Sequence, residues 1–117
     1  MKQEHPSEPA CPPDNAEVAE KAIGPMNGPQ ADADLAAFAK AAGHPTRMRI
    51  LRMLARKDAR MCSHIVDELP LAQSTVSEHL RILRSAGLVK ANENGPRVSY
   101  CIVPSALRRF KDLLNAL

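Results

Sequence analysis

Aromatic residues are scarce in this chain of 117 residues, which has no tryptophan, one tyrosine and two phenylalanines. Its apolar interior must therefore be built from Leu, Ile, Val, Met and Ala, a composition typical of a helical protein. Long apolar runs are also missing, since none reaches the roughly 20 residues that a membrane span requires. The N-terminal stretch MKQEHPSEP lacks the apolar core of a secretory signal. We therefore expect a cytoplasmic protein with no membrane partner.

Cysteine is equally rare, with three residues, Cys11, Cys62 and Cys101, and no Cys-x-x-Cys pair. An odd number of separated cysteines argues against a disulfide framework or a zinc ribbon, and in the cytoplasm these thiols should be reduced at rest. Catalytic signatures are absent as well: the sequence contains no Gly-rich phosphate loop, no HExxH and no GxSxG. We expect neither an enzyme nor an obligatory cofactor.

Prolines and acidic residues are concentrated at the N-terminus. Residues 1–30 hold six of the ten prolines, and two lysines against five carboxylates give them a charge of −3. Residues 31–117 hold fourteen Lys and Arg against eight Asp and Glu, a charge of +6. The first segment cannot bury enough apolar surface to offset its ordering entropy, which predicts a disordered tail at 1–30. The folded domain expected at 31–117 is basic, and its charge favours a polyanionic partner.

The stretch from residue 63 to 87, SHIVDELPLAQSTVSEHLRILRSAG, predicts a helix-turn-helix. Val76, Leu80 and Leu83 recur at helical spacing, so one face of the second helix packs inward. The opposite arc is polar and partly cationic, which suits a helix lying in a DNA major groove. Six residues of this arc are the candidate DNA contacts: Gln73, Ser74, Thr75, Ser77, Glu78 and Arg81. Gly87 is expected to end the helix in a left-handed conformation.

A β-hairpin is predicted directly after this helix. Its parts are a strand beginning at Leu88, a turn at residues 93–96 and a second strand with three alternating core residues, Val98, Tyr100 and Ile102. A helix-turn-helix followed by such a hairpin is a winged helix, in which Arg97 at the wing tip approaches the DNA backbone or minor groove. The alternative is a protein-interaction module that does not bind DNA, but such a module would need neither the wing nor the basic charge.

Four short stretches carry a resemblance to a known family: HPTRMRIL at 44–51, IVDEL at 65–69, QSTVSEHL at 73–80 and GLV at 87–89. In order and spacing they resemble the ArsR/SmtB family of bacterial metalloregulatory repressors, over residues 31–117. The resemblance implies a mostly α-helical winged helix-turn-helix with a small β-hairpin wing, in the order helix, helix, strand, helix, helix, strand, strand, helix. It also implies a homodimeric transcriptional repressor that binds an inverted-repeat operator in double-stranded DNA. Ala72 stands where the family often has a capping Ser or Thr.

The other helices have their own start signals. The expected capping residues are Asp32 or Asp34 for the first helix, Thr46 for the second, Ser63 for the third and Ser105 for the last. The arginines of the second helix should project outward, where Arg47 and Arg49 are candidates for contact with phosphate. His79, beside the apolar arc of its helix, is interpreted as a packing and hydrogen-bonding residue rather than a ligand.

The first and last helices carry more apolar surface than one small domain can cover. A dimer interface would cover it, and in the resembled family these two helices form that interface. The candidate interface residues are Leu35, Phe38, Leu107, Phe110, Leu114 and Leu117. Two-fold symmetry would then place two recognition helices about 34 Å apart, which matches half-sites one turn of DNA apart.

The cysteines are candidates for binding an inducer. If Met61 faces the core, Cys62 faces outward, and strand pairing would set it roughly 5 Å from Cys101 on the outer face of the wing. Thiolates at that spacing suit trivalent arsenic or antimony, for which Cys11 in the tail offers a third sulfur. A redox switch is an alternative, because two close thiols also form a disulfide. The remaining interpretation is that the cysteines are ordinary strand residues.

Two ligand sites of the resembled family do not match this chain. The zinc site between the last helices uses Asp and His, whereas the last helix here offers only Asp112. The Cys-x-Cys site of arsenic- and cadmium-type members is reduced to a single thiol, Cys62.

Overall fold

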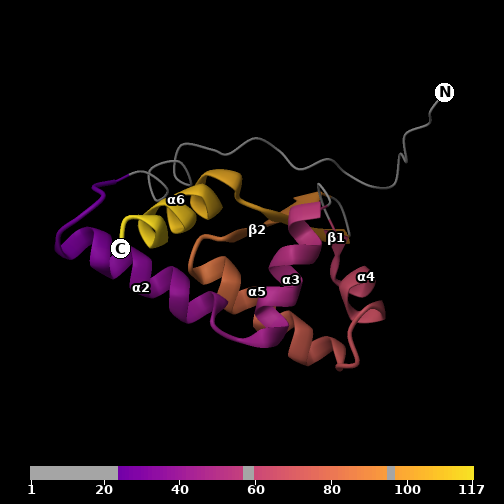
Figure 1. The fold of residues 1–117 in the computed structure, drawn as a ribbon. Coiled ribbons are helices and arrows are strands. Elements are labelled where there is room, and N and C mark those ends of the chain that lie inside the picture. Colours follow the sequence, from indigo (N-terminus) through magenta and orange to yellow (C-terminus); the bar gives the residue numbers. More distant parts are fainter. Residues whose placement is uncertain (1–23, 57–59, 95–96) are drawn as a thin grey trace.

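The computed structural model describes residues 24–56, 60–94 and 97–117, arranged as helices around a small sheet (Figure 1). The elements are α2 (Pro29–Ala42), α3 (Pro45–Arg56), β1 (Arg60–Met61), α4 (Cys62–Asp67), α5 (Gln73–Ser85), β2 (Val89–Asn94), β3 (Arg97–Ile102) and α6 (Pro104–Asn115). Their order confirms the predicted one. Most of the proposed tail lies outside the described ranges, but α2 begins at Pro29, inside the tail's predicted bounds. Among the described helices, none is long and apolar enough to cross a bilayer.

Three of the helices begin with a proline: Pro29 in α2, Pro45 in α3 and Pro104 in α6. Proline is favoured there because its φ angle already fits a helix and because the N–H it lacks would have no partner in the first turn. The predicted caps of these helices were wrong for this reason, since each helix begins ahead of the Asp, Thr or Ser expected to cap it. The fourth cap was also wrong, because α4 begins at Cys62 and Ser63 lies inside it.

The inner face of α5 is buried in the core. Its fully buried residues are the predicted ones, Val76, Leu80 and Leu83. The helix ends at Ser85, and Gly87, two residues beyond it, has a left-handed φ of 86° as expected. The Gly87 N–H donates to the Arg84 carbonyl over 3.0 Å, and the Leu88 N–H donates to the Leu83 carbonyl over 3.1 Å. These two bonds form a Schellman motif, which satisfies the last carbonyls of α5 and directs the chain into β2.

The three strands form an antiparallel sheet in the order β1-β3-β2. Tyr100 and Ile102 of the central strand pack against the core and are half-buried. The expected outer face was wrong, because Cys101, which lies between them, is fully buried. Val98 was expected on the same face as Tyr100, but its side chain is 36% exposed. It pairs with Glu93 near the turn end of the hairpin. The predicted turn includes residues 95 and 96, which lie outside the described ranges.

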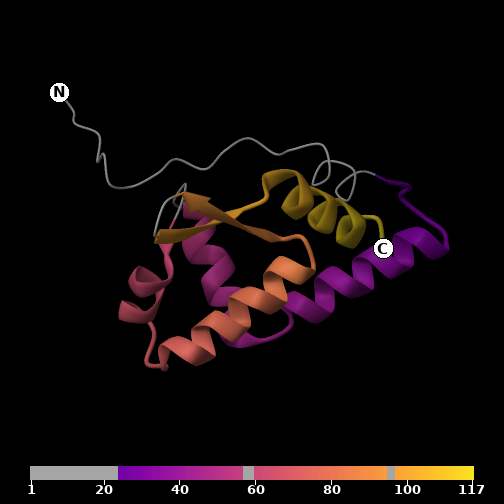
Figure 2. The ribbon, with the colours of Figure 1, turned by 180° about the vertical axis from the view of Figure 1, so that it is seen from behind.

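The helices α2 and α6 pack side by side (Figures 1 and 2). The rings of Phe38 and Phe110 lie with their centroids 5.6 Å apart, and both side chains are buried within one chain. The prediction that Phe38 and Phe110 lie on the surface of a dimer interface was therefore wrong, because a single chain already buries both rings. Of the other candidates, Leu114 is 47% exposed and Leu117 is 91% exposed. The side chains of Leu35 and Leu107 are half-buried.

Candidate DNA-binding interface

The outer side of α5 is the candidate surface for reading DNA. Figure 2 shows this helix at the front of the molecule, running from α4 toward β2. Of the six predicted contact residues, Ser77 is half-buried and the other five are exposed: Gln73, Ser74, Thr75, Glu78 and Arg81. At the N-terminus of the helix, Ala72 makes no side-chain capping bond.

Glu78 and Arg81 form an ion pair on this exposed arc. Arg81 donates from Nε to Glu78 Oε1 over 2.9 Å and from Nη2 to Oε2 over 2.5 Å. The hydrogen bond from Arg81 lowers the pKa of the Glu78 carboxyl, so the pair remains charged at neutral pH. Both side chains are more than half exposed, and exposed pairs contribute little to stability. The ion pair instead has a geometric effect, because its two hydrogen bonds hold the Arg81 guanidinium along the helix in the free protein.

A second cluster lies on the inner side of the same helix, at the corner between α2 and α3. The Arg47 guanidinium donates from Nη1 to His79 Nδ1 over 3.1 Å and from Nε to the Ala41 carbonyl over 2.5 Å. The His44 and His79 rings lie 4.7 Å apart between centroids. Arg47 therefore bonds inside the domain, unlike the exposed Arg49 of the same helix. The interpretation of His79 as a packing and hydrogen-bonding residue is confirmed.

Arg109 of α6 was not singled out from the sequence. Only 4% of its surface is exposed, and it donates to the Asp34 carboxylate and to the backbone carbonyls of Gly24 and Pro25. Its neighbour Arg108 is exposed. Two adjacent arginines on an amphipathic helix give no sequence signal for which one is buried, because that depends on how α2 packs.

The wing places Arg97 at its tip, where the residue pairs with Asn94 across the hairpin. Its side chain lies outside the described part of the structure, so its predicted contact with DNA stays a prediction.

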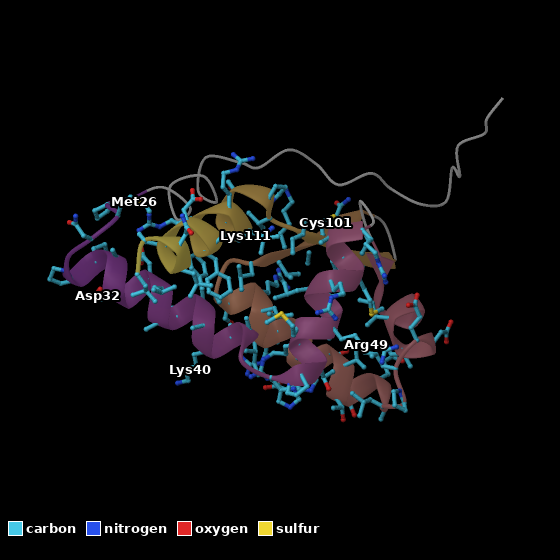
Figure 3. The ribbon with its side chains drawn as sticks, viewed as in Figure 1. Met26, Asp32, Lys40, Arg49, Cys101 and Lys111 are labelled. Carbon is cyan, nitrogen blue, oxygen red and sulfur yellow. The ribbon has the colours of Figure 1, made fainter. Side chains whose placement is uncertain are left out.

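The thiols are arranged differently from the expected cross-strand pair. Cys101 lies on the sheet (Figure 3), opposite Lys90 of β2, and its side chain is fully buried. Since β1 pairs Arg60 with Tyr100 and ends at Met61, Cys62 is not the cross-strand neighbour of Cys101 and instead begins α4. Cys101 is nevertheless joined in a disulfide. The side chains of Cys11 and Cys62 lie outside the described part of the structure.

Inducer binding itself stays a prediction. Within the described residues no three His, Cys, Asp or Glu side chains gather in a cluster that could hold a metal ion. Of the three candidate thiols, Cys11 and the side chain of Cys62 lie outside the described part of the structure, and only Cys101 lies within it.

Comparison with known proteins assigns the family. A family model described as a helix-turn-helix domain matches residues 42–91. An uncharacterised HTH-type transcriptional regulator of Methanocaldococcus jannaschii is 41% identical over 78 residues, which cover 67% of this chain and 88% of that protein. A transcriptional repressor SmtB homolog of Synechocystis sp. is 37% identical over 68 residues, covering 58% of this chain and 51% of that protein.

A solved structure agrees with this assignment. It is the homodimeric winged helix-turn-helix DNA-binding domain of a possible ArsR-family transcriptional regulator from Mycobacterium bovis, determined by solution NMR. Its TM-score is 0.62 and its sequence identity 28%, over 77% of this chain and 86% of that one. The motifs, the winged fold and these similarities together show that the chain belongs to the ArsR/SmtB family of winged helix-turn-helix transcriptional regulators, a family of regulators and not of enzymes.

Proposed function

We propose that the protein is a homodimeric cytoplasmic repressor, which binds an inverted-repeat operator in double-stranded DNA and leaves it when a thiol-reactive inducer binds. The observation that carries the DNA-binding part is the division of α5 into two faces. Its inner residues are fully buried, which fixes the helix on the domain, while its outer arc is polar and exposed. A rigidly held helix with exposed Gln, Ser, Thr and Arg side chains suits base edges in a major groove.

The dimer would form through α2 and α6. These helices already pack together in one chain, and Leu114 remains 47% exposed on α6. The solved domain from Mycobacterium bovis is a homodimer, which supports a dimer here. A two-fold axis at α2 and α6 would present two recognition helices to one face of the duplex, so the operator should be an inverted repeat.

For the inducer we propose trivalent arsenic or antimony. The Cys101 disulfide supports this part, because it requires a second cysteine sulfur within bonding distance. In the reduced protein two such thiols would replace two hydroxyls of arsenous acid and release two waters. Soft thiolates are the ligands that such ions prefer.

The alternative is a repressor of the same fold that responds to oxidants. Here the two thiols give two electrons and two protons to hydrogen peroxide, forming the disulfide and two waters. The disulfide at Cys101 favours this alternative equally. Release by an oxidant without any effect of arsenite would assign the switch to redox chemistry.

Binding to DNA is tested with the segment upstream of the protein's own gene and with sequences selected from a random pool. Arg97→Gln should weaken binding to all sequences and reduce the salt slope by about 1 for each phosphate that the side chain no longer neutralises. Gln73→Ala should instead change the preferred sequence, by about 1–3 kcal/mol at one base position. Arg108→Gln is the matched control, because it removes one exposed charge from α6. If both test variants bound like the wild type at moderate salt, the docking of α5 and the wing would have to be abandoned.

A further inference from the structure

The corner between α2 and α3 closes two helix ends with side chains. The last carbonyls of α2 and the first N–H groups of α3 have no partners within their own helices. At the end of α2 the Ala41 carbonyl accepts the Arg47 Nε hydrogen bond over 2.5 Å. At the start of α3 the Thr46 N–H donates to His44 Nδ1 over 3.0 Å. His44 therefore caps α3, the role that the sequence predicted for Thr46.

The same two side chains then reach α5. The Nη1 of Arg47 donates to His79 Nδ1 over 3.1 Å, so one planar guanidinium joins the end of α2 to the recognition helix. The His44 ring packs against the His79 ring at 4.7 Å between centroids. Both contacts fall on the inner side of α5, and His79 is half-buried there. The orientation of α5 is therefore fixed by polar contacts as well as by its apolar face.

These hydrogen bonds define the protonation states of the two rings. Arginine has only donors, so His79 Nδ1 must accept and carry no proton. A backbone N–H is also a donor, so His44 Nδ1 must accept too. In this arrangement the His79 ring therefore carries its single proton on Nε2, and the Nδ1 atom of His44 carries none. Protonation of either Nδ1 would turn a hydrogen bond into a contact between two donors.

We propose that Arg47, with His79 and His44, positions the recognition helix and makes DNA binding depend on pH, with operator affinity lost as His79 takes up a proton. Arg47 and His79 are positioning residues here, because they act on DNA only through the placement of α5. The proposal rests on the proposed DNA-binding function, because one of its two readouts is operator affinity.

The surroundings of His79 oppose its protonation. Burial lowers its pKa, and the nearby His44 ring and Arg47 charge lower the pKa further, while Glu78 on the same helix acts in the opposite direction. The Glu78 carboxylate is already paired with Arg81. The elements packed against α5 carry further charged groups, among them the exposed Lys40 of α2 and Asp67 of α4 and the half-buried Lys90 of β2. A protonated His79 would thus face the Arg47 guanidinium, which always remains charged.

The experiment measures operator affinity of the full chain at pH 7.5 and 5.5, at constant ionic strength, for wild type, His79→Gln and Arg47→Gln. Wild type should lose affinity on acidification, by less than about tenfold, the limit for a histidine of ordinary pKa. His79→Gln should lose this dependence and keep its affinity at pH 7.5, because the glutamine oxygen can accept from Arg47. Arg47→Gln should bind more weakly at both pH values. Arg49→Gln removes one exposed charge from the same helix and should keep the wild-type pH profile.

A second readout does not depend on DNA. Nitrogen NMR of the free protein at pH 7.5 should show both rings as the Nε2–H tautomer, and the tautomer of His79 should become mixed in Arg47→Gln. An unchanged pH profile in His79→Gln, or an affinity that rises on acidification, would overturn the proposal. If the wild type bound no DNA at pH 7.5, the proposed function would fail. The tautomer measurement would then decide whether the cluster is still formed.

Discussion

Arg109 of α6 donates a hydrogen bond to the Asp34 carboxylate of α2 over 2.9 Å, and only 4% of the arginine side chain is exposed. The same guanidinium binds the carbonyls of Gly24 and Pro25, so it holds together α2, α6 and the segment that precedes α2. At Gly24 a Cβ atom would come within 3.0 Å of Arg109 Nη2, which leaves little room for a larger residue. The two helices proposed to form the dimer are thus joined first within one chain.

We expect Arg109→Gln to destabilise the fold by about 1–3 kcal/mol, since it leaves the carboxylate and two carbonyls without their donor. Urea unfolding at fixed protein concentration measures this effect. Arg108→Gln is the matched control and should change stability by less than about 0.5 kcal/mol, because Arg108 is exposed. Equal losses in the two variants would show that the Arg109 contacts do not stabilise the domain.

Glu78 holds Arg81 along the exposed arc of α5 by two hydrogen bonds. Glu78→Gln removes a negative charge from the surface proposed to face DNA and releases the guanidinium. We therefore expect several-fold tighter binding to unrelated DNA and a steeper salt dependence. Asp67→Asn, which removes an exposed carboxylate from α4, is the control for charge alone. Weaker binding of Glu78→Gln to all DNA would contradict this prediction, whereas a changed sequence preference would mean that Glu78 itself contacts the bases.

Leu114 is 47% exposed on α6, beside α2. A charge at the centre of an apolar interface would be buried without a partner, so Leu114→Asp should dissociate the dimer. Light scattering after size-exclusion chromatography at micromolar concentration measures the mass. Asn115→Asp adds the same charge at the next, exposed position and should remain dimeric. A wild-type protein that is monomeric under these conditions would contradict the prediction.

The thiol hypothesis is tested by serine substitution. Cys62→Ser and Cys101→Ser should each bind operator DNA as the wild type does, but should no longer be released by arsenite or antimonite. Cys11→Ser should weaken the response less, because a tail residue loses conformational entropy when it binds. Because Cys101 is fully buried, the stability of Cys101→Ser is measured alongside. If Cys62→Ser still responded normally to arsenite, antimonite and peroxide, neither sensing mechanism could stand.

The lowered pKa of His79 also predicts a dependence of stability on pH. The unfolded chain, in which a histidine has a pKa of about 6.5, binds a proton more readily than the folded one. The free energy of unfolding therefore rises with pH through the range below about 6.5, and this contribution is lost as the pH falls. Urea unfolding between pH 5 and 8 should show a shallower rise for His79→Gln than for wild type. Identical pH profiles for wild type and His79→Gln would show that a group other than His79 takes up the proton.

Local patterns in the sequence determined the order of the elements, the inner face of α5 and the left-handed Gly87 that follows this helix. Helical spacing, strand alternation and glycine conformation are properties of neighbouring residues, so they can be read without knowing the fold. Membership of the ArsR/SmtB family followed from the same short motifs. The helix starts were also local, but the prolines at Pro29, Pro45 and Pro104 decided them rather than the polar caps.

The tertiary structure alone decided which charged side chains are internal. Arg47 bonds to a histidine 32 positions away, and Arg109 to an aspartate 75 positions away. Their exposed neighbours Arg49 and Arg108 have the same side chain and similar surroundings in sequence. The difference arises from the packing of α2 against α3, α5 and α6, which brings donors and acceptors together only after the apolar faces have met. The pairing of β1 with β3 likewise decided that Cys62 begins a helix and does not lie across from Cys101.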